Sequence, residues 1–151
     1  MAQTLLLVVA DYMTRNMLNI LIVDDHRSSA ETLQLALQTK GHQVLIKQSV
    51  SGAMMLETEI KRSFDVILTD YDVRSDIGIT LLNEFKGQNP NRKSILITGL
   101  DIGEINGADD FDIILTKPLE IEVIEQLIHH WNSNAKRFSE SENIRESQSL
   151  K

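Results

Sequence analysis

The feature that most constrains this chain is an alternation, from Leu18 onward, between short apolar runs and segments of helical periodicity. The runs at residues 19–23 and 65–70 have continuous apolar centres, which is typical of strands buried on both faces of a parallel sheet. Segments between the runs repeat apolar residues at helical spacing. The alternation predicts an α/β domain with five strands and about five helices.

Turn and cap residues mark the expected elements. Gly41 is placed to end the first helix in the left-handed conformation, and Ser51 is placed to cap a second helix that reaches Ile60. A third helix is expected around residues 79–86. The expected strands cover residues 19–23, 43–47, 65–70, 94–97 and 112–116.

Two helices carry an apolar stripe of the kind that packs on a sheet. In the first expected helix the stripe consists of Ala30, Leu33, Ala36 and Leu37. In the last one it consists of Ile121, Ile124, Leu127, Ile128 and Trp131. We therefore expect both helices to pack against the sheet.

The ends of the chain lie outside this pattern. Residues 1–17 contain an apolar run, Leu5 to Val9, which either adds an element or precedes a natural start at Met17. Residues 132–151 are mostly polar, and we expect a largely disordered tail there. The sequence thus predicts an N-terminal extension, one domain over residues 18–131, and a polar tail.

Charge and composition argue against several classes of protein. The chain has 15 basic and 22 acidic side chains and a net charge of −7, which disfavours nucleic-acid binding by counterion release. No apolar run approaches the roughly 20 residues of a membrane span. The first residues lack the basic charge of a signal peptide. Because cysteine is absent, disulfides and thiolate metal sites are excluded, and we expect a cytoplasmic protein.

Polar functional groups follow four of the expected strands. Asp24 and Asp25 close the first strand, Asp70 the third, Thr98 the fourth and Lys117 the fifth. Ligands of an open parallel sheet bind outside the carboxyl ends of its strands, so these groups should converge. Clustered carboxylates raise one another's pKa and call for a divalent ion, and oxygen ligands with retained waters favour Mg²⁺.

This set of groups suits phosphoryl chemistry. With Mg²⁺ neutralising the cluster, a carboxylate can attack a phosphoryl donor as a nucleophile. Lys117 would bring an ammonium group to a phosphate oxygen, and Thr98 a hydroxyl. Each residue alone is more often a turn, surface or strand-end residue, so the indication comes from their joint placement. His26, beside the acidic pair, is interpreted as a polar residue that opens the following helix rather than as a metal ligand.

The strand ends resemble those of a known family, the receiver domains of two-component response regulators. The resemblance covers Leu18 to about Trp131. It implies a doubly wound, five-stranded parallel sheet of order 2-1-3-4-5, the three-layer sandwich of flavodoxin and CheY-like proteins. The motifs that carry it are residues 20–25, 64–70, 95–99 and 116–118.

The resemblance also implies roles for individual residues. Asp70 would accept a phosphoryl group from a phosphohistidine on a sensor histidine kinase or a histidine phosphotransfer protein. Asp25 and Asp70 would bind Mg²⁺ directly, Asp24 largely through water, and Asp72 through its backbone carbonyl. Such a domain modifies its own aspartate, with Lys117 and Thr98 assisting, and is not a turnover enzyme. It would signal through a downstream protein in trans, without nucleic acid or membrane.

The loop after Asp70 departs from the family pattern. Val73 and Arg74 stand where receivers usually carry a Met-Pro-like pair, whereas Gly78 matches the family's glycine. Arg74 is interpreted as a solvent-exposed residue rather than a tuning charge near the phosphate. The Lys117–Pro118 bond resembles one that is cis in the family.

The switch region departs as well. Ile114 stands where the family's switch aromatic is usual, and Phe111 is interpreted as a core residue rather than a displaced switch. The stretch from Thr98 to Lys117 is shorter than is usual in the family, and its two glycines, Gly103 and Gly107, disfavour a helix. We therefore expect a fourth helix of only a turn or two, and a response that differs from the usual switch.

Two other functions compete with this reading. The segment 70–73 resembles the nucleophile motif of haloacid-dehalogenase-type phosphatases, but those enzymes place the nucleophile strand before the acidic pair. The second is a pseudo-receiver that binds partners without phosphorylation. Val73, Arg74 and Ile114 favour it, because they depart from the family pattern. The presence of all five site residues at the strand ends argues against it.

Overall fold

The computed structural model describes residues 1–70, 76–105 and 107–133 of the chain. The chain separates into two units, Met1–Leu119 and Glu120–Lys151, which are described one at a time. In chain order the first unit contains α1 (Ala2–Asn16), β1 (Asn19–Val23), α2 (Arg27–Thr39), β2 (Gln43–Lys47), α3 (Val50–Met54), α4 (Thr58–Ser63), β3 (Val66–Asp70), α5 (Asp76–Gln88), β4 (Lys93–Thr98), the 3₁₀ turns η1 (Ile102–Glu104) and η2 (Ala108–Asp110), and β5 (Ile113–Thr116).

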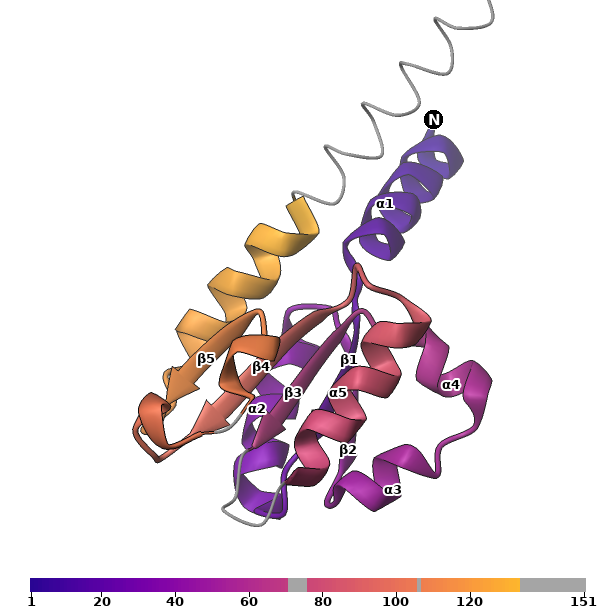
Figure 1. The fold of residues 1–151 in the computed structure, drawn as a ribbon. Helices are drawn as coiled ribbons and strands as arrows, with labels where there is room; N and C mark the ends of the chain where they lie inside the picture. Colours follow the sequence, from indigo (N-terminus) through magenta and orange to yellow (C-terminus); the bar gives the residue numbers. More distant parts are fainter. Residues whose placement is uncertain (71–75, 106, 134–151) are drawn as a thin grey trace, which may run out of the picture. The chain divides into compact units, whose positions relative to one another are not determined.

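The five strands form one parallel sheet in the order β2-β1-β3-β4-β5 (Figure 1). This confirms the predicted fold class and strand order. The burial of the strands explains the sequence pattern. The central strands β1, β3 and β4 are buried over most of their length, whereas the edge strands β2 and β5 are only partly covered. A continuous apolar run is therefore needed only in the centre.

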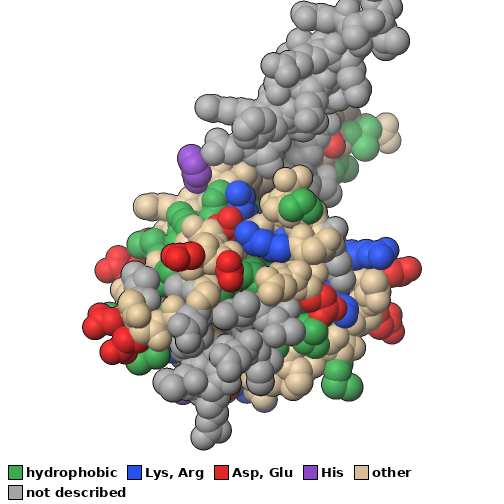
Figure 2. All heavy atoms as spheres, viewed as in Figure 1, with side chains coloured by type: hydrophobic (Ala, Val, Ile, Leu, Met, Phe, Trp, Pro, Cys, Tyr) green, Lys and Arg blue, Asp and Glu red, His purple; other side chains and the backbone are tan. Residues whose placement is uncertain are grey.

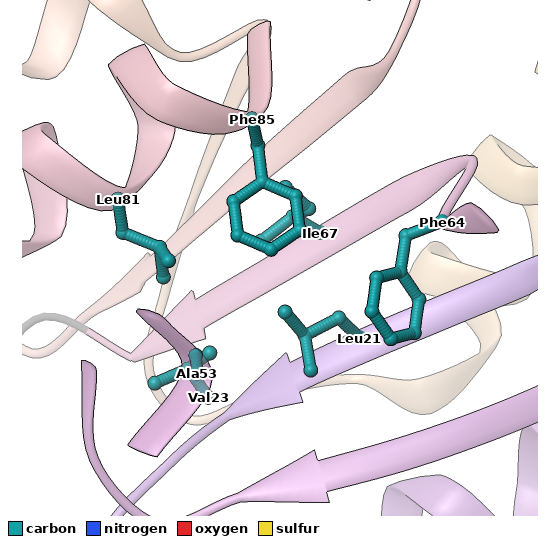
Figure 3. Close-up of a cluster of buried hydrophobic side chains, with 7 residues drawn as sticks. All are labelled: Leu21, Val23, Ala53, Phe64, Ile67, Leu81 and Phe85. Carbon is teal, nitrogen blue, oxygen red and sulfur yellow. The ribbon is translucent and has the colours of Figure 1, made fainter. Parts of the chain in front are cut away.

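One face of the sheet packs against α3 and α5. Every second residue of a strand points to the same face, so Leu21 and Val23 lie together with Ile67 on this side. They meet Leu81 and Phe85 from α5 (Figure 3). The complete buried cluster consists of Leu21, Val23, Ala53, Phe64, Ile67, Leu81 and Phe85.

The alternate residues of β1, Ile20 and Ile22, are also buried, so β1 is covered on both faces. Helix α2 contacts β1 and β2 and buries Ala30, Leu33 and Leu37, as its stripe predicted. At the end of this helix the N–H of residue 42 bonds to the carbonyl of Leu37, and that of residue 41 to the carbonyl of residue 38. Gly41 has φ +93°, which confirms the predicted left-handed end.

The predicted second helix is wrong in its start and its continuity. Ser49, not Ser51, is the N-cap, and its hydroxyl accepts the N–H of Gly52 at 3.0 Å. The helix ends at Met54, and a separate helix begins at Thr58. Both serines satisfy the same sequence preference for a capping hydroxyl, and only the backbone path decides which of them is extended.

Between β4 and β5 the described residues contain only the two 3₁₀ turns, η1 and η2, in place of an α-helix. The predicted shortening of the fourth helix is confirmed, although 3₁₀ turns stand where one or two α-helical turns were expected. Phe111 is buried with Leu82, Leu96 and Ile105, and Ile114 packs against this cluster. Phe111 is therefore a core residue, as predicted.

The N-terminal segment is helical but poorly covered. The five residues from Leu5 to Val9 in α1 are between 47% and 71% exposed, and hydrophobic side chains are open on this helix in Figure 2. Among the described residues, every helix is too short or too polar to cross a lipid bilayer.

In the second unit, residues 121–133 are helical. The least exposed positions of this helix include the predicted stripe, with Ile124 and Ile128 fully buried. The packing of this stripe on the sheet stays a prediction. Residues 134–151, most of the predicted tail, lie outside the described residues.

His42 ties the start of β1 to the turn after α2. Its Nδ1 accepts the N–H of Leu18 at 3.2 Å, which requires the neutral imidazole, and burial lowers the pKa of His42 below its usual 6.5. The folded state then binds this proton less readily than the unfolded state. The stabilisation is present above pH 6.5 and is lost as the pH falls from there through the folded-state pKa.

We predict that His42→Asn flattens the pH dependence of stability between pH 7.5 and 5.5. The asparagine oxygen can accept the same N–H but does not titrate, so this contribution, at most about 1.4 kcal/mol per pH unit, disappears. Urea unfolding of both proteins at the two pH values measures the difference. Equal slopes in wild type and variant would contradict the role of His42.

Asp112 joins β4 to β5 at the end of the sheet opposite the carboxyl ends. Its Oδ2 accepts Lys86 Nζ at 2.9 Å and both the N–H and the hydroxyl of Ser94, at 2.8 and 3.0 Å. Burial acts to raise the pKa of Asp112, but the bonds from Lys86 and Ser94 together outweigh it, so the pKa lies below 3.8. The stabilisation is therefore present above pH 3.8 and is lost as the pH falls through the folded-state value.

We predict that Asp112→Asn lowers the free energy of unfolding at pH 7 by about 1.5–3 kcal/mol, the usual worth of hydrogen bonds to a charged group. The deficit should shrink as the pH falls below 3.8, because the carboxyl of the unfolded chain is protonated there and the folded carboxylate follows at its lower pKa. The exposed Asp110→Asn serves as the control and should be nearly neutral. A deficit that is the same at pH 7 and pH 3 would show that the charge is not involved.

Candidate functional site

The pairing of the strands brings the predicted site residues to one edge of the sheet. Val23 pairs with Thr69, so Asp24 follows β1 at the level where Asp70 ends β3. Thr98 pairs with Thr116, so Lys117 follows directly beyond that pair. Residues distant in sequence thus meet because all the strands are parallel and end together.

Three carboxylates gather at this edge. A carboxylate oxygen from each of Asp24, Asp25 and Asp70, together with a ring nitrogen of His26, lies within 4.8 Å of the others. The aspartate side chains differ in exposure, at 14%, 57% and 6% respectively. Asp70 is therefore the desolvated member, and Asp25 faces solvent.

The crowding of the carboxylates changes the pKa of Asp24. Burial raises the pKa of the Asp24 carboxyl, and the neighbouring Asp70 raises it further. The N–H of His26, which donates to Asp24 Oδ1 at 2.8 Å, and the charge of Lys117 act in the opposite direction. The pKa of Asp24 is therefore raised, as expected for a partly buried carboxyl beside another negative charge.

Lys117 supplies one compensating charge. Its Nζ donates to Asp70 Oδ2 at 3.0 Å. The backbone holds this residue in place, because the N–H of Lys117 donates to the carbonyl of Thr98 at 2.7 Å. The following Lys117–Pro118 peptide bond is cis, as the sequence resemblance implied.

The other oxygen of Asp70 is the clearest sign of a missing ligand. Oδ1 is buried and has no hydrogen-bond partner among the described residues. An unsatisfied buried carboxylate oxygen is costly unless a cation or a donor completes it. Hard oxygen donors from Asp24, Asp25 and Asp70 fit Mg²⁺, which binds through a few carboxylates and retains several waters.

Thr98 lies at the same edge and is fully buried. Its hydroxyl was predicted to donate to a phosphate oxygen, but in the structure it accepts a backbone hydrogen bond. Its Oγ1 accepts the N–H of Leu100 at 3.0 Å. Within the described residues the hydroxyl has no bond to Asp70. The hydroxyl hydrogen remains to be donated, so a group added at Asp70 could recruit it.

His26 lies closer to the acidic cluster than the sequence interpretation expected. It is the N-cap of α2, so its expected position is correct, but its side chain makes no capping bond. Instead Nδ1 lies 2.9 Å from Asp25 Oδ1, 3.6 Å from Asp24 Oδ1 and 3.8 Å from Asp70 Oδ2. The available signal was its position directly after the acidic pair.

Part of the predicted site cannot be placed. Asp72, the predicted backbone ligand, lies outside the described residues, as do Val73 and Arg74. Gly78 lies within α5. The residues that the structure brings together are therefore Asp24, Asp25, Asp70 and Lys117, with His26 added and Thr98 at the same edge.

Comparison with curated proteins finds transcriptional regulatory proteins. The transcriptional regulatory protein ZraR of Escherichia coli O157:H7 is 32% identical over 119 residues, which cover 75% of this chain and 26% of that protein. The uncharacterized transcriptional regulatory protein YkoG of Bacillus subtilis is 32% identical over 114 residues, or 69% of this chain and 46% of YkoG. The chain thus spans less than half the length of either relative.

Solved structures share the fold. A response regulator receiver domain protein from Clostridium thermocellum superposes with a TM-score of 0.67 at 24% identity, covering 80% of this chain and 98% of that one. The response regulator TrrA from Thermotoga maritima, solved in complex with Mg²⁺-BeF, gives 0.63 at 19% identity, with 76% and 99% coverage.

The family model of the response regulator receiver domain matches residues 20–129, which include the strands except the first residue of β1, and every acidic residue of the cluster. With the parallel sheet of order 2-1-3-4-5, this match identifies the chain as a member of the receiver domain family of two-component response regulators.

Proposed function

We propose that Asp70 is the phosphoacceptor of this receiver domain, and that Mg²⁺ bound by Asp24, Asp25 and Asp70, with the backbone carbonyl of Asp72, supports the transfer. The observation that carries the proposal is the state of Asp70. Its side chain is 6% exposed, one oxygen is held by Lys117 Nζ at 3.0 Å, and the other has no partner among the described residues.

The chemistry follows from these contacts. A carboxylate oxygen of Asp70 attacks the phosphorus of a donor phosphohistidine. The P–N bond breaks, and the imidazole nitrogen leaves with the electron pair. The product is an acyl phosphate on Asp70. Mg²⁺, when bound, supplies positive charge to the transferring oxygens.

Lys117 and Thr98 have separate tasks in this proposal. The ammonium group of Lys117, which neutralises Asp70 beforehand, transfers its hydrogen bond to a phosphoryl oxygen. The Thr98 hydroxyl, whose hydrogen is not committed to Leu100, donates to another. The adjacent β4–β5 connection, with its two 3₁₀ turns and Ile114, would then carry the change.

The partners belong to the same proposal. A sensor histidine kinase or a histidine phosphotransfer protein would donate the phosphoryl group, and a downstream protein would bind the modified domain, in the cytoplasm. The named relatives are transcriptional regulators, and this chain matches 26% of ZraR. The net charge of −7 over the 151 residues favours protein partners over nucleic acid. The haloacid-dehalogenase reading is not favoured, because the family model spans both the acidic pair and Asp70 in receiver order.

We predict that incubation with Mg²⁺ and acetyl phosphate adds one phosphoryl group to the wild-type chain, and that Asp70→Asn abolishes the addition. The exposed Asp110→Asn is the matched control and should be labelled normally. Intact mass spectrometry measures the gain, with circular dichroism confirming that each variant is folded. Labelling of Asp70→Asn would place the acceptor elsewhere, and a folded wild type that binds Mg²⁺ but takes no phosphoryl group from acetyl phosphate or a phosphohistidine donor would favour the pseudo-receiver.

A second prediction separates the roles of Lys117 and the carboxylates. Lys117→Ala should retain Mg²⁺ binding, because the ammonium competes with the cation for Asp70 and is not a ligand. Asp25→Asn should weaken Mg²⁺ binding by removing a charged ligand. Calorimetric titration with Mg²⁺ compares the two variants with wild type. A loss of affinity in Lys117→Ala comparable to that in Asp25→Asn would contradict the assigned roles.

A further inference from the structure

We propose that one exposed side of α1 is a self-association surface, through which two copies of this chain pair helix to helix. This surface, the apolar face of α1, consists of Ala2, Leu5, Leu6, Val8 and Val9. The inference is independent of the phosphoryl chemistry proposed above, because α1 contributes no residue to that site. Contiguous apolar side chains on a protein surface mark a place where something else binds.

The five side chains share one side of the helix. At about 100° per residue, their positions fall within about 160° of its circumference. The polar residues Gln3, Thr4 and Asp11 lie on the other side, together with Leu7 and Ala10. An apolar stripe of this width normally packs against another element. Every side chain from residue 1 to residue 11 is nevertheless exposed, so the described part of the chain leaves the apolar face of α1 uncovered.

The charges around the apolar face of α1 favour a second copy of the chain over a lipid surface. Residues 2–10 carry no charged side chain, so two identical faces can meet without like-charge repulsion, as a symmetric contact requires. A helix that lies on a membrane is normally rich in Lys and Arg on its polar side. In α1 the single basic residue is Arg15, in the last turn, and the chain as a whole has a net charge of −7. An anionic lipid surface would therefore repel it.

The position of α1 leaves the acidic site free when two chains pair. Helix α1 ends at Asn16 and β1 begins at Asn19, so the helix leaves the amino end of the sheet (Figure 1). Asp24 and Asp70 lie at the carboxyl end, about 16 Å away along a strand of five residues. A helix of 15 residues is only about 22 Å long, so it covers less than the roughly 800 Å² per partner of a standard interface. We therefore expect a reversible pair that dissociates on dilution.

The test compares two charge substitutions in the full chain. Leu5 is 66% exposed on the apolar face of α1, and Leu7 is 71% exposed on the opposite side. Leu5→Glu and Leu7→Glu add the same charge to the same helix, and glutamate is a good helix former. In sedimentation velocity at a series of concentrations, we expect wild type and Leu7→Glu to shift from one chain to two as the concentration rises. Because Leu5→Glu buries a charge in the pair, its dissociation constant should be at least about tenfold higher.

A distance measurement tests whether the contact lies on α1. The chain has no cysteine, so Leu7→Cys provides a single site for a nitroxide label on the side opposite the apolar face. Two packed helices have axes 8–10 Å apart and are together about 20 Å wide, so pulsed electron paramagnetic resonance should find the two labels roughly 20–35 Å apart. Adding Leu5→Glu to the labelled chain should remove this signal.

Three results would overturn the proposal. The first is a wild type that remains a single chain at every concentration. The second is association that Leu5→Glu leaves unchanged, because the contact would then lie on another surface. The third is flotation of single wild-type chains, but not of Leu5→Glu, with vesicles of phosphatidylcholine and phosphatidylglycerol, which would assign the apolar face of α1 to lipid. Labelling by acetyl phosphate should be equal in wild type and Leu5→Glu, so this test does not depend on the proposed function.

Discussion

The ion pair between Lys117 Nζ and Asp70 Oδ2, 3.0 Å long, is the interaction on which the organisation of this site depends. It joins the ends of β3 and β5, which are separated in the sheet by β4. A carboxylate that is 6% exposed and lies beside two other aspartates is costly to bury without a compensating positive charge. Lys117, whose side chain is partly exposed, supplies part of that charge, and Oδ1 of Asp70 has no partner among the described residues.

The order of the strands in the sheet brings the acidic pair and Lys117 to Asp70. With β1 next to β3, the acidic pair after Val23 reaches Asp70 directly. With β4 between β3 and β5, the carbonyl of Thr98 holds the backbone of Lys117 at 2.7 Å. The opposite end of the same strands is fixed by the carboxylate of Asp112. The β4–β5 connection between these points is two 3₁₀ turns on a small apolar cluster, so a change at Asp70 would pass through a short segment without a helix.

Much of the fold could be predicted because burial leaves a mark on the sequence. Central strands need apolar side chains on both faces, and the runs around Leu21 and Ile67 record this. The left-handed end of α2 at Gly41 and the shortening of the helix before β5 were predicted from the conformational freedom of glycine. The second helix was predicted wrongly, because Ser49 and Ser51 offer equivalent caps and the break after Met54 leaves no comparable signal.

The sequence by itself determined which polar groups lie at the strand ends, because each apolar run marks a buried strand and the polar residues after it mark where the strand ends. Asp24, Asp25, Asp70 and Lys117 could therefore be identified as candidate site residues. Only the tertiary structure decided how their atoms meet. The Thr98 hydroxyl accepts the N–H of Leu100, one oxygen of Asp70 has no partner among the described residues, and the ring of His26 lies beside the carboxylates instead of capping α2. Side-chain direction depends on contacts between distant strands, and those contacts do not exist until the sheet has formed.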